Sequence, residues 1–236
     1  MSRKILLISS SRIHGHEYMA YCRQELLDFW GEVRDLLFVP FALKDQASYA
    51  EKVKAGLEPW GFKITSLHET ADYAAAIASA AGLFVGGGNT FLLTNLLYEH
   101  GLMPLIRERV LGGELRYMGS SAGSNVAGPT MKTTNDMPIV QPPSFDTLNL
   151  VPFQINPHYL DPIPGSLHMG ETREDRIREF HEWNAAPVLG LREGGLVEIS
   201  DGTALLKGIC GARLFQRGQI PEEYLPGADL SFLLRS

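Results

Sequence analysis

The sequence is poor in cysteine, with only Cys22 and Cys210 among its 236 residues. Two cysteines cannot form a disulfide framework, so we expect a reducing compartment. Long hydrophobic runs are also missing, and the opening MSRKILLISSS turns polar too early for a signal peptide. These features predict a cytoplasmic protein that has no membrane partner.

Positive charge is scarce, because 21 Lys and Arg stand against 27 Asp and Glu, a net charge of −6. This balance argues against nucleic acid or anionic membranes as partners, since both carry negative charge. The chain also lacks Pro/Ser-rich linkers, internal repeats and low-complexity segments. At this length a chain buries enough surface to form a core without disulfide or metal cross-links. We expect one domain over residues 1–236, present as a monomer or a homodimer.

What the sequence does contain is a regular alternation of short apolar segments and helical stretches. Ile5–Ile8, Leu36–Pro40, Leu83–Val85 and Leu115–Met118 are apolar runs typical of buried parallel strands. The pattern predicts an α/β fold, a mostly parallel sheet with helices on both faces. Near the C-terminus, Leu196–Ile199 and Thr203–Leu206 flank Asp201-Gly202 and predict an antiparallel hairpin. Because ligands bind at the carboxyl ends of such strands, we expect a site near residues 9–15, 40–45, 86–90 and 119–124.

The clearest chemical signal is Gly119-x-Ser121-x-Gly123, directly after an apolar strand. This is the pattern of a nucleophile elbow, in which small residues let the serine stand above the sheet. Ser121 is then the candidate nucleophile, and the Ala122 N–H a candidate oxyanion donor. The alternative is a Gly/Ser-rich turn without chemistry.

A second glycine-rich segment, Gly86-Gly87-Gly88, follows the strand Leu83–Val85. It fits neither a dinucleotide-binding fingerprint nor a phosphate-binding loop, so no nucleotide cofactor is indicated. Its backbone N–H groups suit a second oxyanion donor, with Gly88 as the candidate. The alternative is a tight turn that requires glycine sterically.

A serine nucleophile needs a base and an orienting acid. His158 follows the apolar segment Leu148–Phe153, which predicts a strand with the histidine on the loop beyond it. Asp136 and Glu193 are the candidate acids, and the residues by themselves do not rank them. No pair of histidines has metal-ligand spacing, so we expect no metal.

Thr172 and Asp175 have the spacing of a capping box and predict a helix start. Arg173 then stands in the first turn, where a cation opposes the helix dipole. That placement favours a clamp for a substrate carboxylate, and the alternative is a solvated helix start.

Five motifs occur in order along the chain: GGGNT, GxSAGxN, TTNDMPIV, QINPH and GETRExRI. Together they resemble peptidase E, the α-aspartyl dipeptidase family of serine peptidases. The resemblance implies a fold similar to class I glutamine amidotransferases and hydrolysis of dipeptides with an N-terminal aspartate, without metal or cofactor. It implies these roles: Ser121 as nucleophile, His158 as base, Gly88 and Ala122 as oxyanion donors, Arg173 as carboxylate clamp, and Asp136 or Glu193 as third triad member, with Asp136 preferred.

The sequence departs from the family pattern at Ser120, where a bulky residue such as tryptophan is usual. Two other functions fit the same motifs. One is a cyanophycinase-like β-aspartyl peptidase of the same superfamily, and the other is a catalytically silent binding module. The expected partner in the enzymatic cases is a small peptide substrate.

Overall fold

The computed structural model describes residues 3–162, 165 and 170–235. Its strands are β1 (Lys4–Ile8), β2 (Asp35–Val39), β3 (Lys63–Ser66), β4 (Gly82–Val85), β5 (Arg116–Ser120), β6 (Gln154–Pro157), β7 (Val188–Leu191), β8 (Gly195–Ser200), β9 (Thr203–Gly208), β10 (Ala212–Phe215) and β11 (Glu222–Tyr224). Its α-helices are α1 (Arg23–Trp30), α2 (Gln46–Leu57), α3 (Tyr73–Ser79), α4 (Thr90–Glu99), α5 (Leu102–Leu111), α6 (Ala122–Asn125) and α7 (Arg173–Trp183). No helix among the described residues is long and apolar enough to cross a membrane.

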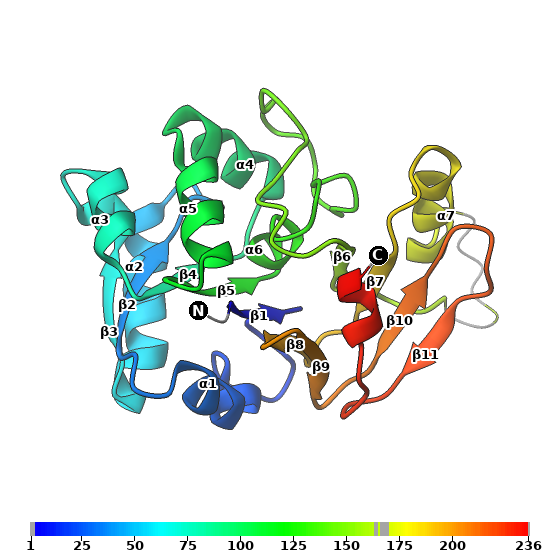
Figure 1. Ribbon diagram of the computed structural model, residues 1–236, viewed down its shortest axis with the longest axis horizontal. Helices are drawn as coiled ribbons and strands as arrows, with labels where there is room; N and C mark the ends of the chain where they lie inside the picture. The colour runs from blue at the N-terminus through cyan, green and yellow to red at the C-terminus, as the bar shows by residue number, and fades with distance from the viewer. Residues whose placement is uncertain (1–2, 163–164, 166–169, 236) are drawn as a thin grey trace.

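The larger sheet has seven strands in the order β3-β2-β4-β5-β1-β8-β9 (Figure 1). The strands from β3 to β1 run parallel to one another, and successive residues alternate between the two faces. Leu6, Phe38 and Met118 pack with α1 and α2 on one face. Leu7, Val39 and Tyr117 pack with α3, α4 and α5 on the other. The predicted α/β architecture, with helices on both faces of a mostly parallel sheet, is confirmed.

The antiparallel strands predicted near the C-terminus are also confirmed. Strand β8 pairs antiparallel with both β1 and β9. The turn between β8 and β9 contains Asp201 and Gly202 with φ of 55° and 78°, positive values that suit a two-residue hairpin. This hairpin completes the edge of the larger sheet beside β1.

A second sheet, in the order β11-β10-β7-β6, was not predicted (Figure 1). The segment Leu148–Phe153, expected as the strand before His158, is instead a buried loop, and the strand is β6. Apolar content did not distinguish this loop from a strand, because Leu148–Phe153 contributes four side chains to the core without pairing with another strand. His158 therefore follows β6 directly, at the end where β6 runs parallel to β7.

Candidate active site

Ser121 occupies the sharp turn between β5 and α6, as the elbow pattern predicts. Its backbone has φ 52° and ψ −110°, a conformation that L-residues rarely adopt and that costs about 1–3 kcal/mol. A Cβ on Gly119 would lie 2.4 Å from the carbonyl oxygen of Gly123, and one on Gly123 would lie 2.1 Å from that of Val85. Both glycines are therefore required sterically for the backbone to pass so close to itself.

The Ser121 side chain is joined to an imidazole and a carboxylate in one hydrogen-bonded series. Its Oγ lies 2.8 Å from Nε2 of His158, and Nδ1 of His158 lies 2.6 Å from Oε1 of Glu193. Since an ionised carboxylate only accepts hydrogen bonds, Nδ1 carries the proton and Nε2 accepts from the serine hydroxyl. This is the tautomer that a general base for Ser121 needs.

The preference for Asp136 as the partner of the imidazole does not agree with this geometry. Oδ2 of Asp136 accepts hydrogen bonds from the N–H of Thr90 at 2.8 Å, its hydroxyl at 2.6 Å, and the Thr134 hydroxyl at 3.1 Å. Thr90 is the first residue of α4, where unpaired N–H groups and the helix dipole attract a carboxylate. Asp136 is therefore bound at a helix N-terminus, and Glu193 occupies the position beside His158.

The backbone of His158 is held by Ser9, a residue that the sequence did not single out. His158 has φ 54°, and its N–H donates to Oγ of Ser9 at 2.9 Å. The Ser9 hydroxyl in turn donates to the carbonyl of Leu191 at 2.7 Å, and Ser9 is fully buried. Ser9 thus ties the end of β1 to the ends of β6 and β7. Its place after a buried parallel strand was the only signal for it.

The triple-glycine segment lies against the serine. A Cβ on Gly87 would approach the Cβ of Ser121 to 2.9 Å, and one on Gly88, with φ 139°, would approach the carbonyl of Ala42 to 2.4 Å. Ala122 begins α6, so its N–H has no acceptor within that helix. Both predicted oxyanion donors therefore belong to segments that border Ser121, and their role stays a prediction.

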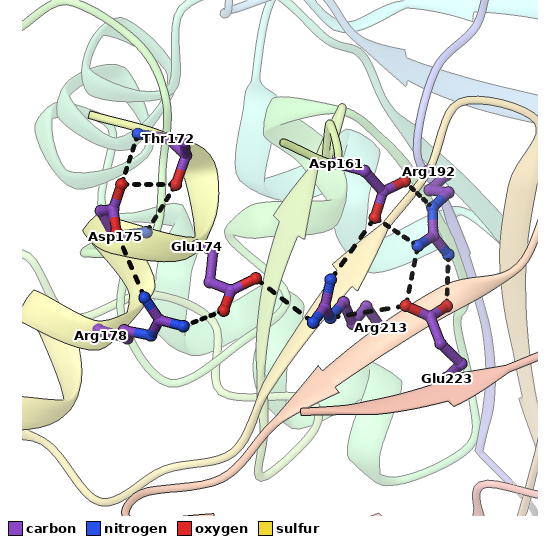
Figure 2. Close-up of polar contacts among 8 residues, drawn as sticks. All are labelled: Asp161, Thr172, Glu174, Asp175, Arg178, Arg192, Arg213 and Glu223. Carbon is purple, nitrogen blue, oxygen red and sulfur yellow. Dashed lines mark hydrogen bonds and ion pairs between the residues drawn. The ribbon is translucent and has the colours of Figure 1, made fainter. Parts of the chain in front are cut away.

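The predicted capping box at the start of α7 is present. The N–H of Asp175 donates to the Thr172 hydroxyl at 3.1 Å, and the N–H of Thr172 donates to the Asp175 carboxylate at 2.9 Å (Figure 2). Arg173 follows the cap, and its guanidinium has no hydrogen bond or ion pair with any described residue. Burial and the neighbouring Arg176 lower the pKa of Arg173, while the carboxylate of Asp136 opposes this shift. Arg173 is thus a half-buried cation that no carboxylate of the described residues binds.

Within the described parts of the chain, no group of three or more His, Cys, Asp or Glu side chains is arranged to hold a metal ion. The groups available for chemistry are those already described. They comprise a serine on an elbow, an imidazole held by a carboxylate, backbone N–H groups beside the serine, and a guanidinium. Such a set is suited to acyl transfer from a carbonyl substrate.

The fold and this arrangement define a serine hydrolase built on an α/β sheet. The chain matches Peptidase family S51 over residues 5–207. It is 50% identical over 236 residues to the probable alpha-aspartyl dipeptidase of Drosophila melanogaster, covering 99% of this chain and 98% of the relative. It is 50% identical over 230 residues to peptidase E of Streptomyces coelicolor, covering 98% and 94%.

Solved structures agree at the level of the fold. A peptidase from an acI-B1 Actinobacterium has a TM-score of 0.69 at 14% identity, covering 98% of both chains. A putative peptidase E from Listeria monocytogenes has a TM-score of 0.67 at 22% identity, covering 88% of this chain and 99% of that one. The chain belongs to peptidase family S51 and is a serine-type peptidase. The family resemblance seen in its five motifs is confirmed.

Proposed function

We propose that this peptidase is a dipeptidase that hydrolyses dipeptides with an N-terminal aspartate. The observation that carries the reaction is the series Ser121–His158–Glu193, with contacts of 2.8 and 2.6 Å. The similarity to an alpha-aspartyl dipeptidase and to peptidase E supports the substrate class. The guanidinium of Arg173, which forms no ion pair within residues 3–162, 165 and 170–235, suits the aspartate carboxylate.

In the proposed reaction, Oγ of Ser121 attacks the scissile carbonyl carbon while Nε2 of His158 takes the hydroxyl proton. The N–H groups of Gly88 and Ala122 donate to the oxyanion that forms, each contributing about 3 kcal/mol to lowering the barrier. His158 then gives its proton to the leaving amine as the C–N bond breaks. Water, deprotonated by His158, hydrolyses the resulting ester and restores Ser121. Glu193 holds the Nδ1 proton and stabilises the imidazolium throughout.

Specificity for aspartate follows from the charge of Arg173. A guanidinium can bind a carboxylate through two parallel hydrogen bonds, whereas an asparagine amide offers one acceptor and no charge. Leaving a half-buried guanidinium without its charged partner costs about 2–5 kcal/mol. Asp-X should therefore be preferred over Asn-X by roughly 30-fold or more in kcat/KM.

The test is hydrolysis of Asp-Leu, Glu-Leu, Asn-Leu, Asp-Leu-Leu and the β-linked isomer of Asp-Leu by the purified protein, with chelator present. The Ser121→Ala variant is the control for contaminating peptidases. We expect turnover of α-linked Asp-Leu above all others, lost in the variant. Preferred turnover of the β-linked isomer would contradict the α-aspartyl assignment, and no turnover of any substrate would contradict the dipeptidase function.

A further inference from the structure

Figure 2 shows an ion-pair network in which Arg192 binds both Asp161 and Glu223. Its Nε and Nη2 donate to the two oxygens of Asp161, both at 2.7 Å. Its Nη1 and Nη2 donate to the two oxygens of Glu223, at 3.0 and 3.1 Å. One guanidinium thus holds two carboxylates in bidentate geometry, the arrangement that defines a guanidinium's orientation most closely.

Arg192 connects the two segments that carry the imidazole and its carboxylate. Asp161 stands three residues after His158, and Arg192 immediately precedes Glu193. Glu193 occupies the second position of a tight turn that is closed by the hydrogen bond from the Gly195 N–H to the Arg192 carbonyl at 2.9 Å. The side chain of Arg192 therefore fixes the start of the turn on which Glu193 stands.

The network continues to helix α7. Arg213 lies 3.5 Å from a Glu223 oxygen and 3.4 Å from a Glu174 oxygen. The Glu174 side chain is only 9% exposed and also pairs with Arg178 (Figure 2). Withdrawing a carboxylate this far from water costs free energy, which ion pairs with the neighbouring guanidinium groups offset. Because Glu174 follows Arg173, the network ends one residue from the proposed carboxylate clamp.

The charges of the network reinforce one another. The hydrogen bonds that Arg192 donates to Asp161 and, to a smaller extent, to Glu223 raise the pKa of Arg192, and Arg192 holds the pKa of Asp161 below its ordinary value. The guanidinium also lies over the ring of Tyr159, 5.6 Å from its centroid. Tyr159 is the residue after His158, so Arg192 contacts the base-bearing segment at two points.

We propose that Arg192 is a positioning residue of the catalytic site, which holds Glu193 against His158 by bridging Asp161 and Glu223. In the same network, Glu174 and Arg213 position the first turn of α7 and with it Arg173. This inference rests on the proposed function for its substrate readouts. The proposal predicts that the two parts of the network affect different kinetic constants. Variants at Arg192 lower kcat, and variants at Glu174 raise KM for Asp-X.

The experiment compares Arg192→Gln and Arg192→Lys with a matched control, Lys54→Gln. Lys54 also pairs with two carboxylates, Glu51 and Glu69, and its side chain is 22% exposed against 23% for Arg192. We expect Arg192→Gln to lower kcat about 10- to 100-fold with KM changed less than about twofold. Arg192→Lys keeps the charge but cannot bind two carboxylates bidentately, so it should restore part of the rate. Lys54→Gln should leave kcat unchanged.

The second readout is the proton NMR resonance of the His158 Nδ1 proton, which lies far downfield when the proton is held in a short hydrogen bond. We expect this resonance in the wild type and in Lys54→Gln, and expect its loss or upfield movement in Arg192→Gln. This measurement needs no substrate, so it tests the positioning role of Arg192 even if the wild type does not hydrolyse Asp-X. Failure of the wild type to hydrolyse Asp-X would refute the proposed function but not the positioning role.

An unchanged resonance together with kcat within about twofold of the wild type in Arg192→Gln would overturn the proposal. If Arg192→Gln fails to fold, the same two measurements on Arg192→Lys test the proposal, with a smaller expected change. A kcat reduced about threefold or more with a displaced resonance supports the role, and wild-type values for both refute it. For Glu174→Gln we expect KM for Asp-Leu to rise about 5-fold or more with the resonance intact. Equal changes in kcat would contradict this separation of kinetic effects.

Discussion

Replacing Glu193 by alanine should abolish most of the activity without unfolding the protein. The change removes the carboxylate that lies 2.6 Å from Nδ1 of His158 and fixes its proton there. Without it the imidazole can adopt the other tautomer, in which Nε2 carries the proton and cannot accept from Ser121. Loss of the orienting acid in a serine triad lowers kcat by about 10³–10⁴-fold, equivalent to roughly 4–5.5 kcal/mol of barrier. The Glu193 side chain is 47% exposed, so the free energy of unfolding should change by less than about 1 kcal/mol.

Asp136→Ala is the matched comparison, because it removes the other candidate acid. Asp136 accepts three hydrogen bonds through one oxygen, two of them from Thr90 at the start of α4. Hydrogen bonds to a charged group contribute about 1.5–3 kcal/mol each, and partial hydration of the freed donors offsets part of this. We expect a loss of about 2–4 kcal/mol in stability, which lowers Tm by roughly 4–15 °C in a chain of this size. Any fall in the activity of Asp136→Ala should result from this loss of stability.

The assay is steady-state hydrolysis of Asp-Leu by both variants and the wild type, together with thermal unfolding of each. The expected pattern is an inactive but stable Glu193→Ala and a destabilised Asp136→Ala. The assignment of Glu193 would be refuted if Glu193→Ala kept more than about a tenth of the wild-type kcat, because an orienting acid contributes far more than that. A stable but inactive Asp136→Ala would instead restore Asp136 as the orienting acid.

Three further results are expected. Arg173→Ala should lower kcat/KM for Asp-Leu at least about 30-fold while Tm stays constant, and equal kcat/KM would remove Arg173 from substrate binding. Ser9→Ala leaves the His158 N–H without its acceptor, so steady-state kinetics should show kcat lowered about 10- to 100-fold, and an unchanged kcat would show that the Ser9 contact is dispensable. Burial raises the pKa of the Cys22 thiol to about 12, so the native protein binds its proton where the unfolded chain releases it. Denaturant titrations should therefore show the free energy of unfolding falling as pH rises above about 8.5, and a Cys22→Ala variant should lose that component.

Most of the parallel sheet could be predicted because its strands are short, apolar and separated by helices with local start signals. Asn89, Asp45 and Asp72 each cap the helix that follows them through a side-chain oxygen. The second sheet could not be predicted in the same way. Its strands are three or four residues long, and β11 carries two glutamates, Glu222 and Glu223, that lie opposite Leu214 and Arg213 of β10. Short polar strands acquire their conformation from pairing rather than from their own residues.

The sequence by itself determined the elbow at Ser121, the glycines on either side of it, the capping box around Arg173 and the alternation of buried strands. These features depend on residues within a few positions of one another, where backbone geometry and sterics decide the outcome. Only the tertiary structure decided that Glu193 rather than Asp136 meets His158, that Ser9 holds the His158 backbone, and that Arg192 bridges Asp161 and Glu223. Each of these contacts joins residues at least 31 positions apart in the chain, and their meeting depends on how two sheets pack. The local sequence makes Asp136 and Glu193 equally plausible as the orienting acid. Only the hydrogen-bond donors that the fold places beside each carboxylate distinguish their roles.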